Sequence, residues 1–257
     1  MATLFRKSGR HVGNSRSNFP RTIATIAFDM YGTVFNVNGL TKDLRNIPSI
    51  GIQKEPAFNA MWRSKQLEYT FRRTCMNKYA PMSECTLHAL DYCCKMFDAP
   101  LTSDEKKNLC DKYTQLPTYE DCKQGLNLLH MSGYRIFAFS NGTRNDISSL
   151  LKNAELVALF HDIVVVDDMK NPVFKPHPNI YQYFIDRSNS DPENTWLVSS
   201  NPFDIMGAAA CGWKTAWMQR TKDIVFDPWP NFEGPTITIS SLIDLKSRLK
   251  MTEKNFD

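Results

Sequence analysis

IAFDMYGTVFNV, residues 26–37, runs from an apolar segment into an aspartate and then into a Gly-Thr turn. The segment from Thr22 to Phe28 is apolar and β-branched, which predicts a buried strand. Asp29 follows directly where that strand ends. Moving a carboxylate out of water costs free energy unless a neighbouring group needs its charge. The stretch therefore predicts a strand and, at its end, a carboxylate kept for a chemical purpose.

Similar apolar runs recur along the chain and alternate with helical patterns. Four more strands are predicted, at 134–139, 163–166, 195–198 and 215–218. The helical patterns between them cover 119–131, 144–153, 177–187 and 203–210. Alternating strands and helices are typical of an α/β fold, in which a parallel sheet carries helices on both faces.

Residues 38–117 interrupt this alternation and contain no strand pattern. Helices are predicted there at 55–78, 84–97 and 102–116. We therefore expect an all-helical cap inserted after the first strand, with a core formed by residues 22–37 and 118–247. A ligand site between this cap and the carboxyl edge of the sheet follows from such an arrangement.

The net charge of +4 is unevenly placed, because residues 1–21 carry five basic residues and no acidic one. The rest of the chain has 26 of the 31 basic residues against 27 acidic residues. This balance argues against a nucleic-acid-binding face. No apolar stretch approaches the roughly 20 residues that span a bilayer, so we expect no membrane partner.

The basic segment 1–21 is typical of a disordered leader or of an organelle transit peptide. The chain has seven cysteines, an odd number without a zinc-binding spacing, which indicates reduced thiols in an intracellular protein. We therefore expect a cytoplasmic location, or a mitochondrial one if the leader is a transit peptide.

Four polar motifs follow the predicted order of strands, and we expect each to close a strand. They contain Asp29, then Ser140-Asn141-Gly142, then Lys175 in FKPHPNIY, and finally Ser199, Ser200, Asn201 and Asp204 in LVSSNPFDIMGA. Each motif alone is uninformative, since such residues are common in turns and loops. Together they predict one site at the carboxyl edge of the sheet. Asp29 is its natural nucleophile, and carboxylates that form covalent esters are an established class.

The first cap helix is predicted to have two different faces. Phe58, Met61, Trp62 and Tyr69 fall together on one face, whereas the opposite face carries Arg63, Leu67 and Phe71 at four-residue spacing. Arg63 either extends its charged end to water along an apolar surface or faces the cleft between cap and core. The pattern alone leaves both interpretations open.

These motifs resemble those of the haloacid dehalogenase superfamily, hydrolases with an aspartate nucleophile and a Rossmann-like core. More narrowly, the chain resembles the (S)-2-haloacid dehalogenases over residues 22–245. The motifs that carry this resemblance are FDMYGTVF, MWRSKQLEYTF, FSNG, KPHPNIY and VSSNPFDIMGA.

Two departures separate the chain from the Mg²⁺-dependent phosphatases of the same superfamily. Those enzymes carry a second aspartate two residues after the nucleophile, where this chain has Tyr31, which cannot act as an acid near neutral pH. They also carry a metal-binding acid at the position of Ser200. Mg²⁺ prefers more oxygen ligands than remain, so we expect neither a metal nor another cofactor. A halide leaves as an anion and needs no proton.

The resemblance implies a role for each site residue. Asp29 attacks C2 of the 2-haloacid with inversion and forms an ester, and Asp204 activates water to hydrolyse it. Ser140 holds the substrate carboxylate, and Arg63 and Asn141 receive the halide. The implied positioning residues are Thr33, Lys175, Tyr181, Ser199 and Asn201. The implied substrate pocket contains Met30, Tyr31, Arg63, Leu67, Ser140, Asn141 and Phe203.

Three pocket positions are unlike the family pattern: Phe203, where relatives commonly have Trp, together with Ser64 and Met82. The natural substrate therefore stays open. The same mechanism suits another 2-substituted acid such as azetidine-2-carboxylate, whereas a phosphatase is disfavoured by Tyr31 and Ser200. A binding protein without chemistry would show a broken nucleophile, lysine or water-activating acid. The expected partners are a small-molecule acid and a second copy of the chain in a homodimer.

Overall fold

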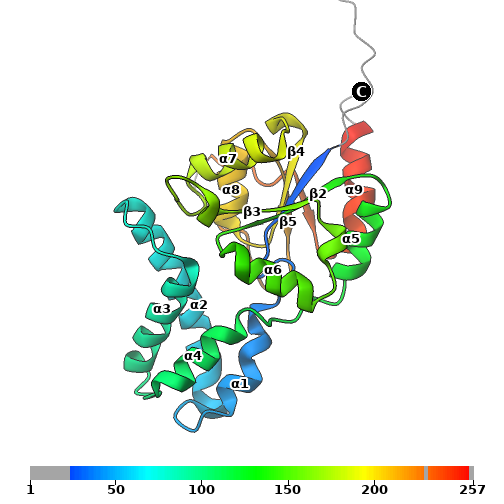
Figure 1. Cartoon of the computed structure of the whole chain (residues 1–257). Coiled ribbons are helices and arrows are strands. Elements are labelled where there is room, and N and C mark those ends of the chain that lie inside the picture. The colour runs from blue at the N-terminus through cyan, green and yellow to red at the C-terminus, as the bar shows by residue number, and fades with distance from the viewer. Residues whose placement is uncertain (1–23, 229–230, 255–257) are drawn as a thin grey trace, which may run out of the picture.

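The computed structural model describes residues 24–228 and 231–254. Within them, six parallel strands form one sheet in the order β3-β2-β1-β4-β5-β6 (Figure 1). Their bounds are Thr25–Phe28 for β1, Arg135–Ser140 for β2, Asp162–Val165 for β3, Thr195–Ser199 for β4, Lys214–Met218 for β5 and Ile237–Ile239 for β6. The five predicted strands are confirmed, and β1 lies at the centre between β2 and β4.

Helices cover both faces of the sheet, as the alternation of patterns predicts. They are α5 (Cys122–His130), α6 (Arg144–Asn153), α7 (Pro178–Ser188), α8 (Pro202–Ala210) and α9 (Leu242–Lys254). Alternate residues of a strand point to opposite faces. Ile26 and Phe28 therefore pack with residues of α5, α6 and α9, whereas Ala27 packs with residues of α7 and α8. This α/β architecture leaves only the ends of the strands open to a ligand.

The interval after β1 is helical and forms a separate lobe beside the sheet in Figure 1. Its helices are α1 (Thr41–Arg45), α2 (Gly51–Cys75), α3 (Met82–Met96) and α4 (Ser103–Lys112). Helix α2 packs on α3 through Phe58 and Trp62, which are fully buried, and the Trp62 indole donates to the Thr86 carbonyl at 2.9 Å. The three predicted cap helices are confirmed, but α2 begins at Gly51 and α1 was not predicted.

Short 3-10 helices complete the described chain: η1 (Val37–Leu40), η2 (Val157–Leu159), η3 (Val166–Asp168) and η4 (Pro192–Asn194). Strand β6 and helix α9 were also not predicted. In the part of the chain that the structure describes, no helix is both long and apolar enough to cross a membrane. The expected leader, residues 1–21, lies outside the described residues.

The register of the sheet brings the polar motifs to one edge. Phe28 is aligned with Ala138 of β2 and with Val198 of β4. The next residue, Asp29, continues the ladder, because its backbone N–H donates to the Val198 carbonyl at 3.0 Å. Since all strands are parallel, the residues that follow β1, β2 and β4 emerge at the same edge, which faces the helical lobe.

Candidate active site

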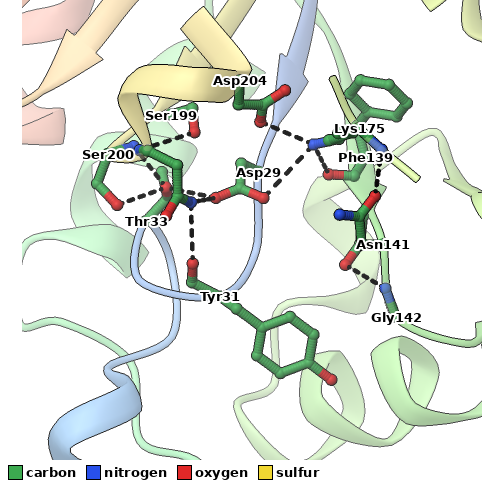
Figure 2. A network of polar contacts seen from close by, with 12 residues as sticks. Asp29, Tyr31, Thr33, Phe139, Asn141, Gly142, Lys175, Ser199, Ser200 and Asp204 are labelled. Atoms are coloured by element: carbon green, nitrogen blue, oxygen red, sulfur yellow. Dashed lines mark hydrogen bonds and ion pairs between the residues drawn. The ribbon is translucent and has the colours of Figure 1, made fainter. Parts of the chain in front are cut away.

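Asp29 lies at the end of β1 and is 94% buried, with a relative exposure of 6%. Its Oδ2 accepts a hydrogen bond from Thr33 Oγ1 at 2.8 Å (Figure 2). It accepts a second hydrogen bond from Asn201 Nδ2, also at 2.8 Å. Its Oδ1 has a longer contact, 3.4 Å from Lys175 Nζ. One carboxylate oxygen is therefore held firmly, while the other keeps lone pairs for a further interaction.

The loop after Asp29 is folded tightly enough to fix this carboxylate. The Met30 carbonyl accepts from the backbone N–H groups of Thr33, Val34 and Phe35. Gly32 has a φ of +88°, and a Cβ there would lie 3.2 Å from Ser200 Oγ, so the position favours glycine on both grounds. Thr33 Oγ1 accepts from the Ser200 N–H at 2.8 Å and so links this loop to the fourth motif.

Lys175 is shared by two carboxylates and is almost completely buried. Its Nζ donates to the Phe139 carbonyl at 2.8 Å and to Asp204 Oδ2 at 2.9 Å, in addition to the contact with Asp29. The ammonium group also lies 3.9 Å from the centre of the Phe139 ring. Because one cation faces two anions, the network carries one more negative than positive charge.

The position of Lys175 in the chain differs from the expectation that each motif closes a strand. Strand β3 ends at Val165, and Lys175 lies ten residues later, in the loop before α7. Asn141 Oδ1 accepts from the Lys175 backbone N–H at 2.9 Å. A side-chain contact from the second motif, and not the end of a strand, therefore holds this loop against the site.

Asp204 lies in the first turn of α8 and is fully buried. Its Oδ1 accepts from the Tyr181 hydroxyl at 2.7 Å, and its Oδ2 accepts from Lys175. Burial raises the pKa of the Asp204 carboxyl above its usual value, Lys175 opposes this increase, and Asp29 adds to it. Burial also raises the pKa of Tyr181 well above its usual value, so this hydroxyl stays a donor.

The serines of the second and fourth motifs hold their own loops. Ser140 is fully buried, and its Oγ accepts from the Gly142 N–H at 3.0 Å. Ser199 is also fully buried, and its Oγ accepts from the Asn201 N–H at 3.1 Å. Ser199 is thus linked to Asp29 through Asn201, whose Nδ2 donates to the Asp29 carboxylate.

Arg63 connects the helical lobe to the site. This contact favours the interpretation that Arg63 faces the cleft between cap and core. Its Nη2 donates to the Tyr31 carbonyl at 3.4 Å, across the boundary between α2 and the loop after β1. Its Nη1 donates to Gln66 Oε1 at 2.6 Å. Gln66 is buried, and its Nε2 donates to Thr86 Oγ1 at 2.5 Å, so α3 supports the arginine through this amide.

The remaining residues of the expected pocket differ in how deeply they are buried. Tyr31 is buried, and this burial raises the pKa of its hydroxyl. Leu67 and Phe203 are partly buried, and the Phe203 ring packs edge to face against Phe71 of α2 with 5.1 Å between ring centres. Met30 is fully buried in the hydrophobic core. Met30 therefore contributes to the core, whereas Tyr31, Leu67 and Phe203 lie in the loop after β1, on α2 and on α8 respectively.

The donor set does not fit a Mg²⁺ ion. Among residues 24–228 and 231–254, no three His, Cys, Asp or Glu side chains gather in a way that could hold a metal. Asp29 and Asp204 both contact the Lys175 ammonium group, which already supplies a positive charge between the two carboxylates. Mg²⁺ needs six oxygen ligands in near-octahedral geometry, and Tyr31 and Ser200 add no carboxylate.

Comparisons of the sequence with known proteins give consistent matches. A family model described as haloacid dehalogenase-like hydrolase matches residues 23–212. (S)-2-haloacid dehalogenase 1 from Pseudomonas sp. (strain CBS-3) is 34% identical over 198 residues, which cover 77% of this chain and 85% of that protein. The (S)-2-haloacid dehalogenase from Pseudomonas sp. (strain YL) is 32% identical over 224 residues, 87% of this chain and 94% of that protein.

Solved structures give the same result for the fold. The L-2-haloacid dehalogenase from Xanthobacter autotrophicus, with chloropropionic acid covalently bound, has a TM-score of 0.80 and 26% identity to this chain. The match covers 89% of this chain and 99% of that one. The similarity therefore includes both the sheet and the inserted helices.

Proposed function

Because the chain belongs to the haloacid dehalogenase-like hydrolase family, we propose that it displaces halide from C2 of short (S)-2-haloacids and releases 2-hydroxyacids. The observation that carries this proposal is the carboxylate pair of Asp29 and Asp204 around the buried ammonium group of Lys175. This arrangement supplies a fixed nucleophile and a second, separately held base. The two (S)-2-haloacid dehalogenase relatives described above support the substrate class.

In the first step, Asp29 Oδ1 attacks C2, and the electron pair of the C2–halogen bond leaves with the halide. The configuration at C2 is inverted, and an ester joins C2 to Asp29. Arg63 and Asn141 receive the halide, while Ser140 and backbone N–H groups hold the substrate carboxylate. Thr33 and Asn201 support this step by fixing Oδ2, so that Oδ1 faces the substrate. A preformed donor set of this kind stabilises developing anions.

In the second step, Asp204 removes a proton from water, and the resulting hydroxide attacks the carbonyl carbon of the Asp29 ester. The C–O bond between that carbonyl and the substrate oxygen breaks, which frees the 2-hydroxyacid and restores the carboxylate. Tyr181 and Lys175 orient Asp204. Ser199 orients Asn201, which in turn holds Asp29.

One panel of substrates tests the proposal against its alternatives. Chloroacetate and (S)-2-chloropropionate test dehalogenation, azetidine-2-carboxylate tests ring opening by the same nucleophile, and p-nitrophenyl phosphate tests phosphatase activity. We expect halide release from the first two. Turnover of p-nitrophenyl phosphate in the absence of halide release would overturn the proposal.

Removal of divalent metals is expected to leave turnover of 2-haloacids unchanged. The reason is that the Lys175 ammonium group already neutralises part of the charge between Asp29 and Asp204. Halide release should be measured before and after dialysis against EDTA, with added Mg²⁺ as the matched control. A large loss on chelation that Mg²⁺ restores would contradict a metal-independent mechanism.

Replacement of Arg63 by alanine is expected to lower kcat for 2-chloropropionate by about 10²–10³-fold, the usual effect of losing one positioned donor. The fold should persist, because Arg63 is only partly buried. Arg72→Ala, at an exposed position of the same helix, is the matched control. If Arg63→Ala were as active as the wild type, Arg63 would not take part in halide binding.

The proposal extends to the organisation of the chain. We propose that residues 38–117 act as the cap and that 22–37 and 118–247 form the catalytic core, preceded by a basic leader at 1–21. We further propose that two copies form a homodimer and that the protein works inside the cell. The seven free cysteines support a reducing compartment. Light scattering of the purified chain tests the dimer, and microscopy of a C-terminally tagged chain separates cytoplasm from mitochondria.

A further inference from the structure

An apolar cavity of about 470 Å³ lies where the C-terminal half of α2 passes α8 and the loop before α7. Its wall contains Phe71 and Thr74 of α2, Phe174 and Pro176 of the loop, and Phe203 and Met206 of α8. Most of these side chains are hydrocarbon, so a ligand there would gain free energy from leaving water. The steps proposed above make no use of this cavity.

Two residues join this cavity to the reaction site. Lys175 lines the cavity, and its Nζ lies 3.4 Å from the nucleophilic oxygen of Asp29. Phe203 also lines it and directly precedes the second carboxylate, Asp204. The cavity and the expected substrate pocket thus share the Phe203 side chain as a common wall.

The geometry of an inverting displacement leaves one substituent free to reach the cavity. The attacking oxygen, C2 and the halide lie in line, so the other three substituents of C2 lie in the plane across that line. The carboxylate is held by Ser140, and the second substituent is a hydrogen. The third substituent is the hydrocarbon chain on C2, which needs an apolar surface such as the wall of this cavity.

The partly buried face of α2 that carries Arg63 leads from the expected halide position to the cavity. Arg63, Leu67 and Phe71 follow each other at four-residue spacing, about 6 Å per step along the helix. Phe71 meets Phe203 edge to face, and both rings line the cavity. Leu67, which lies between Arg63 and Phe71 on this face, offers a hydrocarbon chain an apolar surface in the direction of the two rings.

We propose that this cavity receives the hydrocarbon chain of 2-haloacids longer than 2-chloropropionate, with the Phe71 and Phe203 rings at its entrance. This inference rests on the proposed function and names its substrate class. The inference thus extends the proposed function from short 2-haloacids to medium-chain ones, which we expect to give the higher kcat/KM.

The test is a series of (S)-2-bromo acids, from propanoate to octanoate, with the purified full-length chain. We expect kcat/KM to rise about fourfold for each added methylene until the cavity is filled, the fold-change that corresponds to about 0.8 kcal/mol. A steady fall in kcat/KM from propanoate onward would overturn the proposal. If no member of the series releases bromide, the proposed function fails, and this inference fails with it.

Substitutions on the α8 side of the cavity distinguish an effect on binding of the hydrocarbon chain from an effect on the reaction itself. Met206→Trp fills the cavity from α8 and is expected to abolish the advantage of the longer acids while leaving 2-bromopropanoate turnover unchanged. Met131→Trp, on the exposed surface after α5, is the matched control and should change neither. Ala210→Trp fills the cavity from its exposed rim and replaces Met206→Trp should that variant not fold. If a folded variant with a filled cavity still shows a higher kcat/KM for the longer acids than for 2-bromopropanoate, the cavity does not bind the hydrocarbon chain.

Discussion

Asp204→Asn is expected to release one equivalent of halide per enzyme molecule and then stop, with a substrate-sized mass adduct on Asp29. Asparagine keeps the shape of the side chain and accepts from Tyr181 as the carboxylate does. It cannot take a proton from water, so the ester forms and is not hydrolysed. Lys175 then faces one carboxylate instead of two, which removes the excess negative charge of the buried network.

Peptide mass spectrometry after brief exposure to 2-chloropropionate locates the adduct. Asp29→Asn is the control and should give neither halide nor adduct, because the nucleophile is gone. Its backbone position at the end of β1 stays the same. An adduct on another peptide, or continued turnover in Asp204→Asn, would contradict the assigned roles.

Labelled water distinguishes the ester from direct attack of water on C2. In a single turnover with excess wild-type enzyme in H₂¹⁸O, the 2-hydroxyacid should be mostly unlabelled. The peptide that contains Asp29 should gain the heavy oxygen, because water attacks the ester carbonyl and not the substrate carbon. Label in the first product and none in the peptide would exclude a covalent intermediate, even in a working dehalogenase.

The second large effect is expected for Lys175→Met, which leaves Asp29 and Asp204 buried without their cation. Breaking a buried charge pair on one side typically costs about 3–5 kcal/mol of unfolding free energy. Catalysis should fall by at least about 10²–10³-fold, since both carboxylates lose a positioned charged donor. Thermal unfolding and halide release measure the two effects. Lys123→Met, which removes an exposed pair with Glu155, is the matched control and should change neither.

The pH dependence of the Lys175→Met variant has a definite sign. Burial raises the pKa of Asp204, and Lys175 counteracts this increase. Without the lysine, the folded-state pKa lies further above the unfolded value of about 3.9. A raised folded-state pKa contributes stability at pH values below the unfolded value and loses it as the pH rises through the folded value. The melting temperature deficit of this variant should therefore be smallest near pH 4 and grow toward neutral pH.

Most of the sheet and the composition of the site could be predicted because both depend on local sequence patterns. Five apolar runs identified the five longer strands, and the polar residues after β1, β2 and β4 identified one edge. Helix α9 also carries a clear signal, since Leu242, Leu245 and Leu249 repeat at helical spacing and are fully buried. Strand β6 has only three residues and one neighbour, so its pattern is too short to recognise.

The contacts that were not predicted join residues that are far apart in the sequence and meet only in the folded chain. Gln66 follows Arg63 by three residues, so it lies on the same side of α2, but its role becomes visible only when α3 places Thr86 beside it. The loop that carries Lys175 gives no strand signal, and the Asn141 side chain fixes it from another part of the chain. Sequence patterns identify the reactive groups more readily than the residues that orient them.

The position of Lys175 between two carboxylates has a consequence for the order of the two half-reactions in the proposed mechanism. Ester formation makes Asp29 neutral, so its unfavourable effect on the ionisation of Asp204 disappears. The whole charge of the ammonium group then stabilises the Asp204 anion, which lies 2.9 Å away. The base is therefore most readily ionised only after the substrate has been captured. Loss of the Asp29 charge in the first half-reaction thus favours the ionised form of Asp204, the base that starts the second.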